Sequence, residues 1–366
     1  MHGLNIAFFG SSLVSAHWNG AATYFRGMIK ALAERGHHIT YFEPDAYELQ
    51  QHRDIADPEW AKVVVYESTD ASAVRRALDR ARNADLIIKA GGASAFDDML
   101  DRQVLELKRP GVLVVFWDVD APATLERMRA NANDPFRTLV PDYDLVLTYG
   151  GGPEVARRYG RFGAAECMPV YNALDPSTHH PVMPERRFEA DLAFLANRLP
   201  DREARVGEFF LNTAARMGKH RFLIGGNGWA DKRMPTNIKR VGHVSASQHN
   251  AFNSTPLAVL NIRDSIAAGY SYSPPTRIFE AAGAGACIIT DAWKCIEMFL
   301  EPGTEVLVAH NSEEVAAHLA ALTPDRARRI GRNALRRINA HHTYQQRAEQ
   351  VEAALEGRFV TEEAVV

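Results

Sequence analysis

Short apolar runs alternate with segments of helical periodicity along almost the whole chain of 366 residues. Runs that are apolar throughout are typical of strands buried on both faces, as in parallel sheets covered by helices. In the first half, the predicted strands are NIAFFG (5–10), HITYF (38–42), KVVVY (62–66), DLIIK (85–89), GVLVVFW (111–117), YDLVLTY (143–149) and ECMPV (166–170). This alternation predicts an α/β fold built on a parallel sheet.

The alternation of apolar runs and helical segments is interrupted once and then resumes. Residues 171–191, YNALDPSTHHPVMPERRFEAD, are rich in proline and polar residues and have no periodicity, which is typical of an interdomain segment. The strands predicted after it are DLAFLA (191–196), RFLIGG (221–226), IKRVG (238–242), LAVLNI (257–262), ACIITD (286–291) and EVLVAH (305–310). We therefore predict two Rossmann-like domains that face each other across a ligand-binding cleft.

We place the N-terminal domain at residues 1–171 and the C-terminal domain at residues 172–342. The stretch 323–357 has helical character throughout. We expect residues 343–366 to form a helix that crosses back to the N-terminal domain, followed by a disordered tail, TEEAVV.

Charge and composition exclude several classes of protein. The formal net charge is −3, so no excess of positive charge favours nucleic acid or an acidic membrane as a partner. No apolar run is long enough to span a bilayer. The N-terminus is apolar but lacks a basic region, so we do not expect a signal peptide. The three cysteines fit no disulfide framework, which favours a reducing, cytoplasmic location.

Histidines occur in adjacent pairs, and adjacent rings cannot share one face of a helix. The pairs are His37 with His38, His179 with His180 and His341 with His342. Since no zinc spacing is present either, we expect no metal site and no essential metal or other cofactor.

The stretch SYSPPTRIFEAAGAGACIITD (271–291) contains the most informative single pattern. Two prolines precede a short helix, whose free N-terminal amides favour an anion such as phosphate. Arg277 adds positive charge there, and the carboxylate of Glu280, one turn further on, is suited to accept hydrogen bonds from a ribose diol. The alternative interpretation is that Arg277 and Glu280 form an ordinary i,i+3 helix pair.

This stretch resembles the nucleotide-sugar signature of GT-B glycosyltransferases, and the chain as a whole resembles the CgeB-like (spore-maturation-type) glycosyltransferases, which have a family-1-like C-terminal domain. The motifs that carry the resemblance are, in chain order, FFGSSLVSAHWNGAATYFRGMIKALAERGH, PVYNALDP, LAFLANRLPDRE, FLIGGNGW and SPPTRIFEAAGAGACIITD. The resemblance implies sugar transfer from a nucleotide-diphosphate sugar to an acceptor that the sequence does not identify. It leaves open the base (UDP or dTDP), the sugar and the oligomeric state.

The resemblance also implies roles for individual residues. Glu280 would bind the ribose, and Arg198, with Arg202 as a second candidate, would neutralise the diphosphate. For Arg198 and Arg202 the alternative is surface solvation. The other implied donor-binding residues are Asn227 and Gly228 in the donor pocket, Ser273, Thr276 and Arg277 near the phosphates or the sugar, and Gly20, which would let the N-terminal loop close.

One departure from the pattern concerns the mechanism. Many retaining GT-B enzymes carry a Glu-x7-Glu pair, but the position eight residues before Glu280 is Tyr272. Sugar recognition must therefore differ, and the choice between inversion and retention stays open.

The N-terminal domain is expected to hold the acceptor, whose hydroxyl must lose a proton. In FWDVDAPAT, Asp118 directly follows a predicted strand and is the first candidate for the general base. His17, in the glycine loop, is the second. Alternatively, Asp118 or Asp120 caps the following helix and His17 only positions phosphate.

Two other functions fit the same architecture. One is a nucleotide-sugar epimerase or hydrolase, and the other is a two-lobed sugar-binding protein without catalysis. A dinucleotide oxidoreductase is disfavoured because GSSLVSAHWNG after the first strand is not G-x-G-x-x-G.

Overall fold

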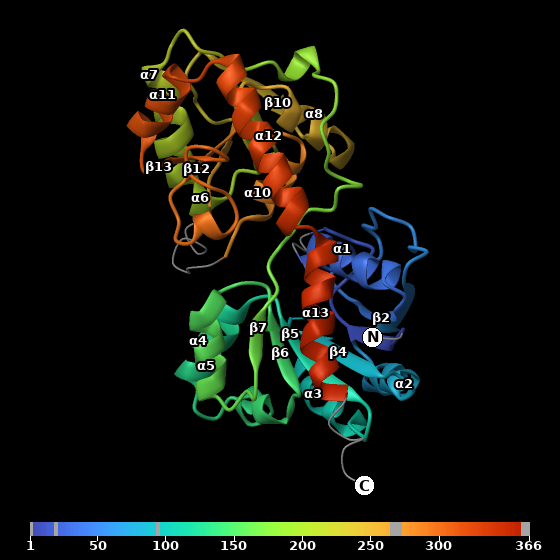
Figure 1. Ribbon diagram of the computed structural model, residues 1–366. Helices are drawn as coiled ribbons and strands as arrows, with labels where there is room; N and C mark the ends of the chain where they lie inside the picture. Colours follow the sequence, from blue (N-terminus) through green and yellow to red (C-terminus); the bar gives the residue numbers. More distant parts are fainter. Residues whose placement is uncertain (1–2, 18–20, 93–95, 264–272, 360–366) are drawn as a thin grey trace. The chain divides into compact units, whose positions relative to one another are not determined.

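The computed structural model describes residues 3–17, 21–92, 96–263 and 273–359 of the chain. These residues form two compact units (Figure 1). One contains the chain as far as Tyr171 together with the helix α13 (Tyr344–Phe359), and the other contains Asn172–Thr343. We call them the N-terminal unit and the C-terminal unit. The predicted tail, residues 361–366, lies outside the described residues.

The N-terminal unit is built on a parallel sheet with the strand order β3-β2-β1-β4-β5-β6-β7. Its strands are β1 (Asn5–Phe9), β2 (His38–Asp45), β3 (Lys62–Glu67), β4 (Leu86–Ala90), β5 (Leu113–Asp118), β6 (Leu145–Thr148) and β7 (Cys167–Pro169). Its helices are α1 (Ala21–Glu34), α2 (Ala71–Ala81), α3 (Asp97–Gln103), α4 (Ala121–Ala130), α5 (Gly152–Arg161) and α13. The strand order reverses between β1 and β4, which is where such sheets bind ligands.

The C-terminal unit repeats this plan with the order β10-β9-β8-β11-β12-β13, again parallel. Its strands are β8 (Leu192–Leu195), β9 (Phe222–Gly225), β10 (Ile238–Gly242), β11 (Ala258–Asn261), β12 (Ile288–Asp291) and β13 (Leu307–Ala309). Its helices are α6 (Pro200–Val206), α7 (Asn212–Arg216), α8 (His249–Ser254), α10 (Thr276–Gly283), α11 (Ser312–Ala320) and α12 (Pro324–His341), with a π-helical turn at Gly207–Leu211. Each predicted strand overlaps one of the observed strands.

The cores explain why the apolar runs are continuous. All five residues of β4 are buried, and so are the last five of β5, because helices cover both faces of the sheet. Lys89 breaks the apolar run of β4 yet is fully buried. Its ammonium lies 3.1 Å from the carboxylates of both Asp97 and Asp101, so the buried charge is paired.

The final helical stretch is not continuous, which corrects the expectation for residues 323–357. The helix α12 ends at His341, and the next two residues are drawn into pairing with the segment that follows the N-terminal unit. The backbone nitrogen of Leu174 donates to the carbonyl of His342 at 2.8 Å, and Leu174 and Thr343 form a parallel bridge. The break therefore arises from a contact distant in sequence, which helical periodicity cannot report.

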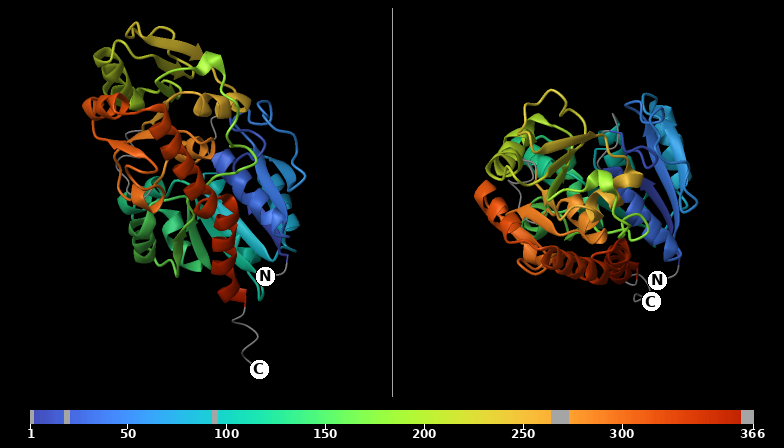
Figure 2. Two further views of the ribbon diagram at one scale, coloured as in Figure 1. Left: turned by 45° about the horizontal axis from the view of Figure 1, so that its top comes forward. Right: turned by 90° about the horizontal axis from the view of Figure 1, so that it is seen from above.

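The helix α13 belongs to the N-terminal unit and lies beside α1, as the red and blue helices of Figures 1 and 2 show. Tyr344 packs directly on Gly27 of α1, and a Cβ at position 27 would lie 2.2 Å from the Tyr344 ring. Arg347 donates to the carbonyl of Tyr171 at 3.1 Å, and Arg35 pairs with Glu352 at 2.6 Å. In the described part of the chain, every helix is too short or too polar to cross a bilayer.

Candidate active site

Two loops meet at the carboxyl edge of the C-terminal sheet, one after β8 and one after β9. Gly226, in the loop after β9, has φ +112° and approaches the β8 loop so closely that a Cβ would lie 2.1 Å from the carbonyl oxygen of Ala196. The backbone nitrogen of Arg198 donates to the carbonyl of Asn227 at 2.9 Å. A Cβ on Gly228 would lie 3.1 Å from that of Arg198. The fold thus brings three predicted donor residues, Arg198, Asn227 and Gly228, into contact.

Arg198 is held by carboxylates. Its guanidinium donates to Glu203 at 2.9 and 3.1 Å and to Asp231 at 3.1 Å, and the hydrogen bonds that it donates to Glu203 are the first cause of the raised Arg198 pKa. Lys232 also pairs with Glu203, and Arg198 and Lys232 together hold the pKa of Glu203 at about 2. The side chain of Asp231 is 79% exposed, so its pairing with Arg198 is the weaker of the two.

The helix α10 follows β11 and begins at Thr276, after Pro275, as the proline pair predicted. Thr276 accepts a hydrogen bond from the amide of Asn172, which ties the start of α10 to the segment after the N-terminal unit. Ser273 is half-buried, three residues before the helix. The Gly283–Gly285 turn after α10 packs closely on its neighbours, since a Cβ on Gly331 of α12 would lie 2.1 Å from the Gly285 carbonyl oxygen.

Arg277 and Glu280 do not form the ordinary i,i+3 pair that was the alternative interpretation. They interact electrostatically, but within the described residues no hydrogen bond or ion pair joins them. The Nη1 atom of Arg277 is buried without a hydrogen-bond partner there. Burial lowers the pKa of Arg277, Glu280 raises it, and the neighbouring charge of Arg202 lowers it further. A buried donor of this kind calls for an acceptor, and an anionic ligand would provide one.

In the N-terminal unit, a cavity of about 420 Å³ opens where the strand order reverses. It is lined by residues at or just after the ends of three strands: Ser11 after β1, Gly91 and Gly92 after β4, and Asp118 as the last residue of β5. Asp97, Asp120, Thr124 and Arg127 line it as well. Its position at the carboxyl ends of the strands is the one at which parallel sheets bind ligands.

Asp118 lies in this cavity with only 1% of its surface exposed. Its Oδ1 accepts hydrogen bonds from the backbone nitrogen of Asp120 at 2.9 Å and from the Thr124 hydroxyl at 3.2 Å. Its Oδ2 accepts one from the hydroxyl of Tyr159. Burial raises the pKa of Asp118 to about 6 although these hydrogen bonds oppose the rise. A carboxylate with that pKa is suited to accept a proton near neutral pH.

The remaining acceptor-side predictions have different outcomes. Asp120 caps α4 by accepting from the backbone nitrogen of Ala123 at 3.5 Å, as the helix-cap interpretation predicted. His17 is exposed, stacks on His52 with ring centroids 4.1 Å apart, and does not line the Asp118 cavity. Its role stays a prediction. Gly20 lies outside the described residues.

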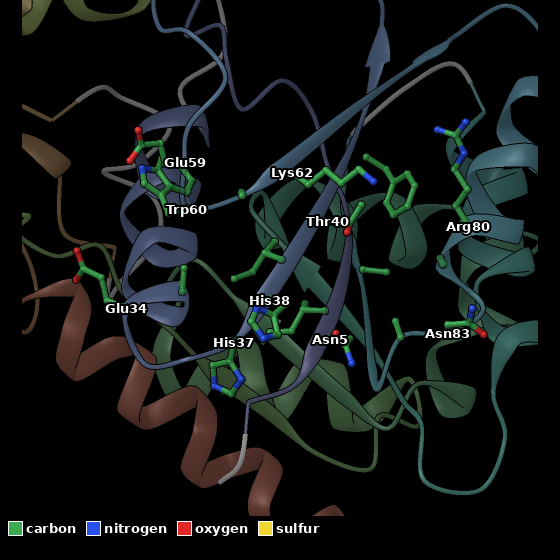
Figure 3. A pocket seen from close by; sticks show the side chains of 18 residues that line it. Asn5, Glu34, His37, His38, Thr40, Glu59, Trp60, Lys62, Arg80 and Asn83 are labelled. Carbon is green, nitrogen blue, oxygen red and sulfur yellow. The ribbon is translucent and has the colours of Figure 1, made fainter.

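A larger cavity, of about 880 Å³, lies at the opposite edge of the same sheet (Figure 3). Asn5, His38 and Lys62, which begin β1, β2 and β3, line it. We do not place the active site there, because ligands of parallel sheets bind at the carboxyl ends of the strands. His37, which also lines it, is a structural residue: its ring accepts from the backbone nitrogen of Leu4 at 3.0 Å and contacts Glu352 at 2.9 Å.

Sequence reasoning missed several residues at these two sites. Tyr159 lies in α5, far from Asp118 in sequence, and nothing in its neighbourhood marks it. Arg205 and Arg263 both approach the buried carboxylate of Asp291, at 2.5 and 3.9 Å. Asp291 ends β12, and its place at the end of an apolar run was the one signal that could have found it.

Comparisons with known proteins agree with this architecture. A family model described as "Glycosyl transferase-like" matches residues 202–353, which is less than half of the chain. No match was found among curated protein sequences. HepE of Anabaena, solved with UDP and glucose, is 14% identical with a TM-score of 0.68, over 97% of this chain and all of its own.

Two further solved structures are similar over a comparable length. Sucrose-phosphate synthase of Thermosynechococcus elongatus is 13% identical with a TM-score of 0.68, over 98% of this chain and 100% of its own. An alpha-glucosyltransferase, solved with UDP-glucose and DNA containing an abasic site, is 10% identical with a TM-score of 0.70, over 97% of this chain and 100% of its own. At such low identities these likenesses show the fold. The chain has the GT-B glycosyltransferase fold, which confirms the predicted fold class, and it carries a glycosyl transferase-like domain.

Proposed function

We propose that this chain is a glycosyltransferase that moves a sugar from a nucleotide-diphosphate sugar to an acceptor hydroxyl. The observation that carries the proposal concerns two residues of α10, Arg277 and Glu280, which no hydrogen bond or ion pair joins in the part of the chain that the structure describes. Arg277 has a buried guanidinium nitrogen without a partner in the described residues, and the carboxylate of Glu280 accepts no hydrogen bond there. A nucleoside diphosphate supplies an anion for Arg277 and a ribose diol for Glu280.

Other donor contacts follow from the same geometry. The N-terminal amides of α10 favour the diphosphate, and Arg202 adds charge near Arg277. Arg198 would exchange its exposed partner Asp231 for a phosphate oxygen and keep Glu203. Giving up an exposed ion pair costs at most about 1 kcal/mol. Asn227, Gly228, Ser273 and Thr276 complete the proposed pocket. Because leaving-group charge grows during transfer, these cations would stabilise the transition state as well as bind the donor.

UDP is the nucleotide we propose first, with dTDP as the alternative. HepE and the alpha-glucosyltransferase were solved with UDP or UDP-glucose, and this supports the choice by analogy of fold alone. The five motifs named above support a place among the CgeB-like enzymes. We further propose that no metal is essential, since cationic side chains and a helix N-terminus supply the positive charge that the diphosphate needs. Loss of transfer in EDTA that Mg²⁺ restores would contradict this.

On the acceptor side, we propose that the 420 Å³ cavity receives the acceptor and that Asp118 takes its proton. His17 is the second candidate for the base, and Gly20 is proposed to help close the N-terminal loop on the donor. We also propose a cytoplasmic location. Transfer assays with the matching sugar donor would identify the acceptor and show whether the configuration is inverted or retained.

The test measures nucleotide binding by calorimetry and thermal shift, with UDP, dTDP, GDP, ADP and NAD as ligands. We expect wild type to bind one nucleoside diphosphate preferentially. Glu280→Ala and Arg277→Gln should each weaken binding about 10- to 100-fold, because hydrogen bonds to charged groups contribute roughly 1.5–3 kcal/mol.

Glu208→Ala and Arg329→Gln are matched controls, since both side chains are exposed in the same unit and neither residue belongs to α10. Equal affinity in Glu280→Ala and wild type would remove the ribose role. Interconversion of a UDP-sugar without any acceptor would instead favour an epimerase. Sugar binding without nucleotide binding would favour the two-lobed binding protein.

A further inference from the structure

Two histidines that are far apart in sequence lie beside Glu280. His179 comes from the segment between the two units' sheets, His249 begins α8, and Glu280 lies in α10. One ligand atom from each residue lies within 4.8 Å of the other two, and all three residues are half-buried. From the adjacent histidine pairs we expected no metal site. This cluster, however, combines His179, from one such pair, with His249, which lies 70 residues further along the chain.

Several contacts fix the three segments to one another without using the cluster itself. The amide of Asn250, next to His249, donates to the carbonyl of Thr178 at 2.9 Å. The hydroxyl of Ser254, at the end of α8, donates to the carbonyl of Ala284 just after α10, also at 2.9 Å. At Gly283, a Cβ would lie 3.1 Å from the carbonyl oxygen of His179. The backbone therefore holds the three side chains together in advance of any ligand.

Hydrogen bonds also fix which ring nitrogen of each histidine carries the proton. The Nε2 of His249 lies 3.3 Å from the carbonyl of Val244, and because a carbonyl only accepts, Nε2 must donate. The Nδ1 of His179 lies 2.9 Å from the Thr178 hydroxyl, which itself donates to the carbonyl of Asp175 at 3.1 Å. That hydroxyl oxygen is then the acceptor for His179. Each neutral ring keeps one nitrogen with a free lone pair, Nδ1 in His249 and Nε2 in His179.

In metal-binding histidines the second ring nitrogen commonly donates to a protein oxygen and orients the ring, and each of these two rings has one such hydrogen bond. Two imidazoles and one carboxylate suit a divalent transition-metal ion and leave a fourth position open for water. Bonds of about 2.0–2.1 Å place tetrahedral ligand atoms about 3.3 Å apart, so small side-chain rotations must close the 4.8 Å cluster around the ion. The guanidinium of Arg277 is a nearby charge that opposes binding.

We propose that His179, His249 and Glu280 bind a divalent transition-metal ion such as Zn²⁺, and that the bound ion withdraws Glu280 from the nucleotide. The second clause rests on the proposed function, because it assumes that Glu280 holds the ribose. The ion would therefore inhibit donor binding. It is chemically distinct from a Mg²⁺ that bridges phosphates, because Mg²⁺ prefers oxygen ligands and keeps its waters.

The first experiment measures metal binding alone. Metal-free protein is titrated with Zn²⁺ by equilibrium dialysis, and with Co²⁺ while the visible d–d bands of a tetrahedral site are recorded. We expect one ion per wild-type chain. His179→Ala and His249→Ala should each weaken binding at least about tenfold, as losing even an outer-shell partner does. His180→Ala is the matched control, because His180 is exposed beside His179 and should leave the affinity unchanged.

The variants His179→Gln and His249→Gln keep a polar side chain, so they test the site if an alanine variant does not fold. Far-ultraviolet circular dichroism checks each of them. Equal Zn²⁺ affinity in wild type and both histidine variants would overturn the proposal. So would the absence of Co²⁺ d–d bands, or a loss of affinity in His180→Ala as large as that in His179→Ala.

The second experiment titrates UDP into metal-free and Zn²⁺-loaded protein. We expect Zn²⁺ to weaken UDP binding at least tenfold in wild type and less than twofold in His179→Ala. Zn²⁺ that binds at the cluster without changing the UDP affinity would overturn the competition clause. Failure of metal-free wild type to bind any nucleoside diphosphate would overturn the proposed function, while the dialysis result would still decide the metal site.

Discussion

Tyr159 donates its hydroxyl hydrogen to the Oδ2 of Asp118, and both side chains are buried in the N-terminal unit. This hydrogen bond joins α5 to the end of β5 across 41 residues of sequence. It places a phenol behind the carboxylate while the carboxylate lines a cavity at the carboxyl edge of the sheet. An ordinary buried aspartate would serve only structure. An aspartate with a pKa of about 6 that faces a cavity can also serve as a base.

The first prediction concerns the acidic side of the pH profile. If Asp118 is the base, it acts only when ionised, so kcat/KM should fall about tenfold per unit below pH 6 and level off above it. Asp118→Asn should lower the rate of sugar transfer by about 10²- to 10⁴-fold at pH 7. The measurement is transfer from the donor identified by calorimetry. If the acidic limb persists unchanged in Asp118→Asn, another residue is the base, and His17 is the second candidate.

The second prediction treats Tyr159 as a positioning residue. Its hydrogen bond lowers the pKa of Asp118 relative to burial alone. Tyr159→Phe removes that bond and should move the acidic limb to higher pH by about one to two units, since a hydrogen bond to a charged group contributes roughly 1.5–3 kcal/mol. A purely structural role would lower the rate at every pH and leave the limb in place. The pH profiles of the two proteins therefore separate the roles.

The third prediction links Asp118 to stability. Its pKa is about 6 in the folded protein and ordinarily 3.8, so between these values the folded chain holds the additional proton. The resulting stabilisation is complete below about pH 4 and is lost as pH rises through about 6, to a total of roughly 3 kcal/mol. Asp118→Asn does not lose it. In urea unfolding, the free energy of unfolding of the variant relative to that of wild type should therefore be higher at pH 7 than at pH 4. An equal difference at both pH values would contradict the raised pKa of Asp118.

The fourth prediction tests how α13 is held against α1. In Gly27→Ala the new Cβ would lie 2.2 Å from the ring of Tyr344, which is itself buried and contacts Tyr24 with ring centroids 6.2 Å apart. We expect a loss of about 1–3 kcal/mol on urea unfolding. Gly160→Ala is the control, because it is exposed in α5 and nothing lies within 4 Å of its Cβ. It should be neutral or stabilise the protein by up to about 1 kcal/mol. Equal effects at both positions would count against close packing of the two helices.

The fifth prediction concerns the loops beneath Arg198. Gly226 has a left-handed φ of +112°, and a Cβ added there would lie 2.1 Å from a backbone oxygen. In Gly226→Ala, neither a side-chain rotation nor a small shift would relieve this clash and the backbone strain. We expect a loss of at least about 2 kcal/mol in stability and weaker UDP binding, since the Arg198 and Asn227 contact must change. In Gly218→Ala, where nothing lies within 4 Å of the Cβ, both quantities should stay near wild type. Unchanged UDP affinity in a folded Gly226→Ala protein would separate Arg198 from donor binding.

Local sequence patterns predicted the two parallel sheets, their strands in chain order and the position of α10. They could do so because apolar periodicity and proline or glycine boundaries depend only on neighbouring residues. The start of α10 after Pro275 and the capping of α4 by Asp120 are examples. By contrast, the break between α12 and α13 depends on Leu174, more than 160 residues away.

The amino-acid sequence by itself therefore determined the fold class and the segments from which the candidate site residues come. Tertiary structure decided which side chains meet: Tyr159 with Asp118, Glu203 and Asp231 with Arg198, and His179 with His249 beside Glu280. The physical reason is that crossover connections bring strand ends together across tens of residues, and a side chain's burial, charge and proton affinity depend on the partners it meets there.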